Sequence, residues 1–279
     1  MKTSTQLKAM IKNLSHSNNI DAQILLRNYM FERLLERISL SKYQDRIILK
    51  GGMLIAAMVG IDYRSTMDMD TTIKGEVLTK EIVKKIFEDI FVLNIDDNVK
   101  MALKLIEEIR DEDDYIGFRI LIETVLDKTK QILKIDITTG DFITPKEITY
   151  NFNLMFEDRT IKIKAYNLET ILAEKLETII IRSIANTRMR DFYDVFILAT
   201  TQKNNIDILV LKEAFKKTSI RRGTDKITLE KGKEILKLVS VDKIMQKHWE
   251  RYKNKYSYAN AIEWEQTINS ISELIHQII

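Results

Sequence analysis

The chain contains no cysteine, and this absence excludes several kinds of chemistry at once. None of its 279 residues is Cys, so disulfides, thiolate metal sites and cysteine nucleophiles are ruled out. Its three histidines, His16, His248 and His276, are far apart and lack the spacing of a zinc-binding helix. We therefore expect neither a thiol enzyme nor a zinc enzyme.

Linker residues and long apolar runs are also scarce. The sequence has one proline and eight glycines, so no flexible linker is evident. No apolar run reaches the roughly 20 residues that cross a bilayer, and the first residues lack the apolar core of a signal peptide. With 45% hydrophobic and 30% charged residues, the composition is that of an ordinary globular protein. We expect a cytoplasmic protein with no membrane partner.

Positive charge is unevenly distributed. The formal net charge is only +3, but residues 201–255 carry fifteen Lys and Arg against seven Asp and Glu. Such a cluster attracts phosphate backbones, or it is simply a set of solvated helix faces, and both interpretations remain open. The aromatic residues near its end, Trp249, Tyr252, Tyr256 and Tyr258, either stack on bases or belong to a core. For Trp249 we expect the core.

The order of sequence patterns predicts an α+β protein. Helical periodicity covers residues 5–40, 53–59 and 79–91, and strand patterns cover 67–73, 115–126, 131–138 and 147–166. From residue 168 onward the pattern is helical. A chain of this length exceeds the common domain size. We therefore predict a domain with a mixed sheet over residues 1–166 and a mostly helical domain over residues 167–279.

One segment of the first domain carries the pattern of a magnesium–nucleotide site. Gly51 and Gly52 open a short helix, whose free N–H groups suit a phosphate. Asp68 and Asp70 occupy alternate positions of the next strand, so they face the same side. Carboxylates are the hard oxygen ligands that Mg²⁺ prefers. The spacing alone is a weak signal, because paired aspartates also occur on ordinary surfaces.

A third carboxylate and several cations extend this pattern. Asp136 lies among apolar neighbours of a later strand, where a lone charge is costly, so it is either a surface residue beside a turn or it lies near a cation. Three such carboxylates could hold two magnesium ions about 3.5–4 Å apart. Four cations are candidates to neutralise a triphosphate: Lys50, Arg64, Lys175 and Arg182.

The helical domain contributes a possible ionic group. Asn167 is a suitable N-cap for the helix that carries Lys175. Asp191 and Asp194 are three residues apart, hence neighbours on one helix face. Two plainer interpretations compete with a functional one. In the first, Lys175 is an ordinary solvent-facing residue. In the second, Arg190 forms a salt bridge between the lobes with Asp191 or Asp194.

Four ordered blocks resemble the AbiEii/AbiGii toxin family of nucleotidyltransferases, which belongs to the DNA-polymerase-β-like superfamily. The blocks run from about residue 45 to 200, and they are Leu49-Lys50-Gly51-Gly52, Arg64-Ser65-Thr66-Met67-Asp68-Met69-Asp70, Ile135 to Asp141, and Ala173-Glu174-Lys175-Leu176 with Arg190-Asp191-Phe192-Tyr193-Asp194. The resemblance implies a polymerase-β-like lobe followed by a helical lobe that completes the active site.

The resemblance also assigns roles to residues. Asp68 and Asp70 would be metal ligands, and Asp136 the third, acting as base for the attacking hydroxyl. Lys175 would contact nucleotide phosphates, supported by Asp191, Asp194 or both. The remaining nucleotide-binding candidates are Lys50, Gly51, Gly52, Arg64, Ser65, Thr66 and Arg182. Superfamily members commonly have Gly-Ser at Gly51-Gly52, so the hydroxyl would have to come from Ser65 or Thr66.

The family resemblance implies a magnesium-dependent toxin of a toxin–antitoxin or abortive-infection pair that defends bacteria against phage. It would transfer a nucleoside monophosphate from a nucleoside triphosphate to an acceptor, which we expect to be the tRNA 3′ end. The antitoxin would be encoded separately. Two alternatives remain open: a small-molecule nucleotidyltransferase resembling those that modify aminoglycosides, and a non-catalytic regulator that binds nucleotides or nucleic acid.

Overall fold

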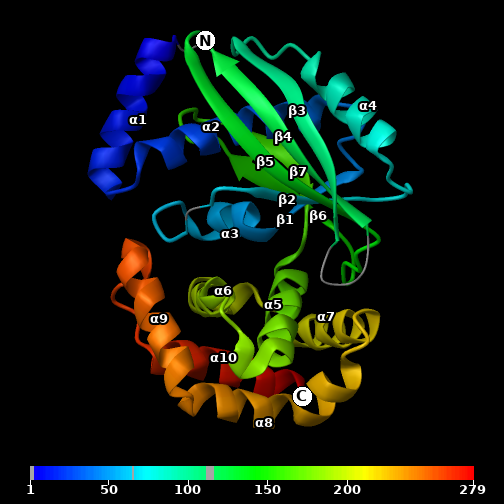
Figure 1. Ribbon diagram of the computed structural model, residues 1–279, viewed down its shortest axis with the longest axis vertical. Coiled ribbons are helices and arrows are strands. Elements are labelled where there is room, and N and C mark those ends of the chain that lie inside the picture. Colours follow the sequence, from blue (N-terminus) through cyan, green and yellow to red (C-terminus); the bar gives the residue numbers. More distant parts are fainter. Residues whose placement is uncertain (1–2, 65, 111–115) are drawn as a thin grey trace. The chain divides into compact units, whose positions relative to one another are not determined.

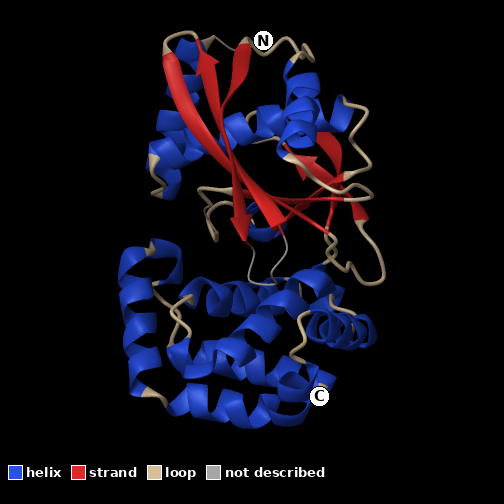
Figure 2. Cartoon of the chain, turned by 45° about the vertical axis from the view of Figure 1, so that its right-hand side comes forward, coloured by secondary structure: helices blue, strands red, loops and turns tan. Residues whose placement is uncertain are grey.

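The chain has an α+β fold made of two compact units. A computed structural model describes residues 3–64, 66–110 and 116–279 (Figure 1). Unit 1 comprises Met1–Asp141 with Ile148–Ala165, and unit 2 comprises Phe142–Glu147 with Tyr166–Ile279. In the described part of the chain, all strands belong to unit 1, whereas unit 2 is built of helices (Figure 2).

Unit 1 is organised around one mixed sheet of seven strands in the order β3-β4-β5-β2-β1-β7-β6. Two of its neighbouring pairs are parallel, β2 with β5 and β1 with β7, and the others are antiparallel. The strands are β1 (Ile47–Lys50), β2 (Met69–Ile73), β3 (Val99–Arg110), β4 (Ile116–Leu126), β5 (Thr129–Thr139), β6 (Ile148–Asn153) and β7 (Thr160–Ala165).

The helices of unit 1 are α1 (Ser4–Asn18), α2 (Ala22–Leu40), α3 (Gly51–Val59) and α4 (Lys80–Phe91). The helical pattern predicted for residues 5–40 is confirmed, and it is divided into two helices. Asn19 adopts the left-handed conformation that ends α1. The side chain of Asp21 then caps α2 by accepting from the Gln23 N–H. The predicted glycine start of the short helix α3 is confirmed, and Gly60 follows its last residue as the C-cap.

The side chains of strand β5 alternate between the buried core and the polar face of the sheet. Leu133, Ile135 and Ile137 are completely buried. Lys134 and Asp136 alternate with them and are only partly buried, because successive side chains of a strand point to opposite faces. The strand predicted over residues 131–138 is confirmed, and its alternation places Asp136 on the polar face.

Unit 2 contains six α-helices in the described sequence. They are α5 (Leu168–Arg182), α6 (Met189–Thr201), α7 (Ile208–Arg221), α8 (Asp225–Val241), α9 (Lys243–Lys255) and α10 (Trp264–Ile278). The predicted N-cap is confirmed, because the Asn167 side chain accepts from the Thr170 N–H. Trp249 is completely buried, so its assignment to the core is also confirmed.

The segment 142–147 needs a correction. Our boundary after residue 166 placed it in the first domain, but it belongs to unit 2. Hydrogen bonds explain this: the Asn167 amide donates to the Thr144 carbonyl at 2.7 Å, and the Thr144 N–H donates to the Thr170 hydroxyl at 3.0 Å. None of the helices in the described ranges combines the length and apolarity that a membrane crossing requires.

Candidate active site

Strand pairing brings the three predicted carboxylates of unit 1 to one region. β2 and β5 run parallel, with Asp70 directly beside Asp136. Asp68 precedes β2 by one residue and lies two positions before Asp70. The charges of Asp136 and Asp68 both act on Asp70. The polar face of the sheet therefore gathers carboxylates from β2 and β5 and from the turn that precedes β2.

Two of these carboxylates are paired with cations from neighbouring positions of the sheet. Lys134 Nζ lies 2.7 Å from Asp68 Oδ2. Arg119, opposite Asp136 on β4, donates two hydrogen bonds of 2.8 Å to it. The expectation that Asp136 lies near a cation is thus confirmed. Among the described residues, no three acidic or histidine side chains are arranged so that they could hold a metal ion as they stand.

Asp70 is held by backbone instead. Gly51 has a φ of +66°, and a Cβ at this position would lie only 2.0 Å from Asp70 Oδ2. The Gly52 N–H at the start of α3 donates a hydrogen bond to Asp70. Burial raises the pKa of Asp70, and the neighbouring Asp136 and Asp68 raise it further against the opposing effect of Lys50. The glycine pair is therefore required for the close approach of α3 to this carboxylate.

Lys50, a predicted phosphate-binding cation, is held by a residue that the sequence did not single out. Its Nζ lies 2.6 Å from Asp141 Oδ2, and both side chains are largely buried. The Thr138 hydroxyl donates to the same carboxylate oxygen at 2.9 Å. Asp141 follows Gly140, whose φ of +77° turns the chain just after β5. This carboxylate therefore fixes Lys50 at the end of β1.

Arg64 and Thr66 surround Gly52. A Cβ at Gly52 would lie 2.9 Å from Arg64 Nη2 and 3.0 Å from Thr66 Oγ1. Arg64 is almost fully buried, and the Thr66 hydroxyl donates to the Asp68 carbonyl at 2.9 Å. The structure thus places a hydroxyl beside Gly52, as we expected for Thr66. Ser65, the other candidate, lies outside the described residues.

Unit 2 contains a compact ionic group around Lys175. Its Nζ lies 2.8 Å from Asp191 Oδ1 and 2.8 Å from Asp194 Oδ2. Arg188 adds a contact of 2.9 Å to the other oxygen of Asp191. Burial acts to lower the pKa of Lys175, but the two carboxylates outweigh it and the pKa is raised. Lys175 therefore stays charged, and it is held in one position.

This group decides between the competing interpretations of the helical domain. The side chain of Lys175 is 15% exposed, so it is not an ordinary solvent-facing lysine. Arg190 hydrogen-bonds Tyr256, and among the described residues it contacts neither Asp191 nor Asp194. Arg182 lies seven residues after Lys175, about two turns along α5. The alternative of an Arg190 salt bridge is therefore wrong.

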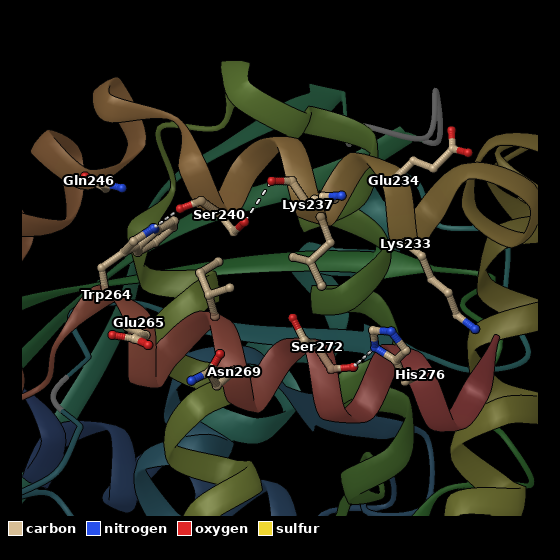
Figure 3. Close-up of a pocket in the computed structure, with 12 residues that line it drawn as sticks. Lys233, Glu234, Lys237, Ser240, Gln246, Trp264, Glu265, Asn269, Ser272 and His276 are labelled. Atoms are coloured by element: carbon tan, nitrogen blue, oxygen red, sulfur yellow. Dashed lines mark hydrogen bonds between the residues drawn. The ribbon is translucent and has the colours of Figure 1, made fainter.

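A pocket of about 680 Å³ occupies another part of unit 2, where α8 and α10 approach each other (Figure 3). Trp264 closes one end and donates a hydrogen bond of 2.9 Å to the Ser240 carbonyl. Lys233, Lys237 and Glu234 line the α8 side. None of the predicted site residues lines this pocket, so the Lys175 group is separate from it.

The fold and sequence define a nucleotidyltransferase. The chain belongs to the family of AbiEii nucleotidyl transferase toxins of type IV toxin–antitoxin systems, whose family model matches residues 33–270. The predicted family is therefore confirmed. Family membership implies a nucleotide substrate and an antitoxin partner. Among curated proteins, no sequence matches this chain.

Two solved structures share the fold. One is a candidate nucleotidyltransferase from H. pylori, with a TM-score of 0.50 and 16% identity, covering 93% of this chain and 96% of that one. The other is JHP933 from Helicobacter pylori, with a TM-score of 0.50 and 15% identity, covering 93% of each chain. At such low identity the likeness concerns the fold alone.

Proposed function

We propose that this toxin transfers a nucleoside monophosphate from a nucleoside triphosphate to the 3′ end of tRNA, in a magnesium-dependent reaction that aborts phage infection. The observation that supports this most strongly is the placement of Asp70 beside Asp136 on paired strands, with Asp68 two residues earlier. These carboxylates adjoin the glycine-opened start of α3.

The donor set fits magnesium. Asp68, Asp70 and Asp136 supply only carboxylate oxygens, which are hard ligands. Their mutual repulsion contributes to the raised pKa of Asp70, so added positive charge favours the group. We assign these three residues as ligands of two ions. Bound Mg²⁺ would supply charge neutralisation at the phosphates and at the attacking oxygen.

The chain's own residues then bind and orient the reactants. The acceptor hydroxyl oxygen forms a bond to the α-phosphorus, and the bond from this phosphorus to the bridging oxygen breaks, releasing pyrophosphate. The hydroxyl proton passes to Asp136. The N–H groups at the start of α3 and the side chains of Arg64 and Thr66 bind phosphate oxygens, and Lys50 adds positive charge.

Lys175 supplies a further phosphate contact in this proposal. Asp191 and Asp194 stabilise its charged form, and a carboxylate oxygen of each lies 2.8 Å from the Lys175 Nζ. Because both carboxylates contact it equally, we assign the support to the pair and not to either one alone. Arg182, on the same helix, is assigned to the nucleotide as well. A fixed ammonium group is suited to binding a phosphate that changes little during the reaction.

We assign the acceptor from the excess of positive charge in residues 201–255. Residues 201–255, which include all of α7, α8 and α9, carry fifteen Lys and Arg against seven Asp and Glu. An excess of this size attracts nucleic acid through counterion release. An RNA acceptor accounts for it, whereas a small aminoglycoside is itself cationic and calls for an acidic surface.

The test is transfer of label from each of four α-labelled nucleoside triphosphates to total RNA, with magnesium or with a chelator. We expect labelled RNA of tRNA size only with magnesium. Asp70→Asn should lower the rate roughly 100- to 1,000-fold, as loss of one preorganised charge contact does elsewhere. Asp127→Asn is the matched control, because this exposed residue lies in the turn between β4 and β5 of the same sheet.

The outcomes separate the parts of the proposal. Equal rates for Asp70→Asn and Asp127→Asn would refute the assigned carboxylates. Undiminished transfer in chelator would refute the metal. Label appearing in a small-molecule fraction, and not in RNA, would refute the acceptor while leaving the transferase chemistry in place.

A further inference from the structure

Two cations of unit 2 converge on one tyrosine. Arg190, near the start of α6, donates a hydrogen bond of 3.1 Å to the Tyr256 hydroxyl, and its guanidinium lies 5.6 Å from the ring centroid. Lys255, the last residue of α9, has its Nζ 5.3 Å from the same centroid. Both charges therefore lie around a single half-buried phenol.

This group has donors but no counter-charge. Within the described part of the chain, neither Arg190 nor Lys255 pairs with a carboxylate. Lys253, two residues earlier, contrasts with them because it pairs with Glu263 at 2.7 Å and Glu250 at 3.6 Å. The Tyr256 oxygen accepts from Arg190, and its own O–H has no acceptor among the described residues. A guanidinium, an ammonium and a phenol O–H together form a donor set for an anion.

Electrostatics and packing fix the arrangement. Burial acts to raise the pKa of Tyr256, but Arg190 and Lys255 outweigh it and lower the pKa below its ordinary value. Tyr258 stacks against the Tyr256 ring, with centroids 5.3 Å apart and an interplanar angle of 23°. This packing holds the ring, and with it the hydroxyl, in one place, so the site is preorganised.

Its location indicates which anion it takes. Arg190 immediately precedes Asp191, one of the two carboxylates that hold Lys175. Lys255 ends the basic stretch 201–255. The group therefore connects the proposed phosphate-binding lysine with the basic helices. A backbone phosphate of an RNA strand that follows these helices would be the anion in reach of all three donors.

We propose that Arg190, Lys255 and Tyr256 bind one backbone phosphate of the RNA acceptor. This inference rests on the proposed function, because it supplies an acceptor contact for that same reaction. A phosphate oxygen would take the place of the missing counter-charge, with the Tyr256 O–H donating to it. The same chemistry would also suit a phosphate of the nucleotide, and the experiment below distinguishes the two sources.

The experiment measures binding of a fluorescent single-stranded RNA by anisotropy at several salt concentrations, and binding of a nucleoside triphosphate in parallel. Tyr256→Phe should weaken RNA binding roughly threefold to tenfold, the range for one hydrogen bond. Arg190→Gln with Lys255→Gln should weaken it more, and should reduce the slope of log affinity against log salt by about 0.7, the value for one phosphate on a single strand. Nucleotide binding should not change.

Tyr258→Phe is the matched control, since the Tyr258 hydroxyl already contacts the Tyr252 hydroxyl at 3.1 Å. It should bind RNA like the wild type, and thermal melting should show that all variants are folded. If wild type binds and labels RNA but Tyr256→Phe and the double variant match it, the inference is wrong and the proposed function stands. Weaker nucleotide binding with intact RNA binding would also overturn it. If wild type neither binds nor labels RNA, the acceptor proposal itself fails.

Discussion

The Asp68–Lys134 pair of unit 1 and the Lys175 group of unit 2 differ in how firmly they are held. In unit 1, Asp68 and Lys134 are 39% and 32% exposed, so water competes for their contact. In unit 2, Lys175 is 15% exposed while Asp191 and Asp194 are 4% and 0% exposed. Exposed pairs contribute little and exchange partners easily, whereas breaking a buried group is costly. Asp68 is therefore free to change partner, and Lys175 is not.

Asp70 is intermediate between these cases, because backbone and not a charged side chain determines its position. Gly51 and Gly52 bring the start of α3 against it. Unit 1 thus combines a fixed carboxylate, Asp70, with an exchangeable one, Asp68. In the proposed reaction, an exchangeable carboxylate would be able to take up a metal ion, whereas a fixed lysine would keep its charge in one place for a phosphate.

The strongest test of this comparison removes the cation of the buried group. Lys175→Met keeps the length of the side chain but leaves Asp191 and Asp194 without their shared partner. We expect the free energy of unfolding to fall by about 3–5 kcal/mol, the cost of an uncompensated buried charge. Transfer activity should also be lost. Chemical denaturation of wild type and variant measures the first effect.

A compensated variant separates stability from function. Adding Asp191→Asn and Asp194→Asn to Lys175→Met removes the two buried negative charges that had faced Lys175, so most of the stability should return while activity stays absent. If Lys175→Met alone unfolds like the wild type, the group is not the rigid element that its burial indicates.

A smaller effect is expected at the glycine that fixes Asp70. Gly51→Ala places a Cβ 2.0 Å from Asp70 Oδ2 on a backbone with a φ of +66°. We expect a loss of about 1–3 kcal/mol in unfolding free energy from strain, and lower activity because the carboxylate must move. Gly75→Ala is the matched control, since Gly75 has a φ of +81° but no atom within 4 Å of the added Cβ. Equal activity of the two variants would show that contact with Asp70 is irrelevant.

The sequence predicted the candidate site residues better than it predicted the residues that contact them. Alternation along a strand was enough to place Asp136 on a polar face, but its partner depends on register. The strands predicted over 115–126 and 131–138 leave four residues, 127–130, for the turn between them, whereas β4 and β5 pair Leu126 with Thr129 across a two-residue turn. That difference of two residues determines that Arg119, and not Leu121, lies opposite Asp136.

Strand β3 and the role of Asp141 were not predicted, because each depends on a local irregularity of the backbone. Strand β3 was not predicted, because its register shifts between Leu103 and Leu105 and breaks the two-residue period. Asp141 was missed because only the folded turn at Gly140 brings it to Lys50. The Lys175 group was easier to predict, since Asp191 and Asp194 share a face by helical spacing alone. Spacing within one element is encoded locally, while contacts between elements depend on the whole fold.

The smallest expected effect concerns Lys134, which pairs with the exchangeable carboxylate Asp68. Lys134 neutralises Asp68 in a half-exposed pair, so Lys134→Gln should change the unfolding free energy by less than about 1 kcal/mol. It should nevertheless strengthen magnesium binding by roughly twofold to fivefold. Lys134 competes with the ion for Asp68, and its removal saves the pair's energy of less than about 1 kcal/mol. Lys104→Gln is the control, as Lys104 pairs with Glu123 on the same sheet, away from the proposed ligands. Magnesium titration followed by thermal melting reads this directly, since an ion that binds the folded state raises its melting temperature with concentration. Identical titration midpoints for the two variants would mean that Lys134 does not compete with the metal, and that the exposed pairs of unit 1 are as fixed as the buried group of unit 2.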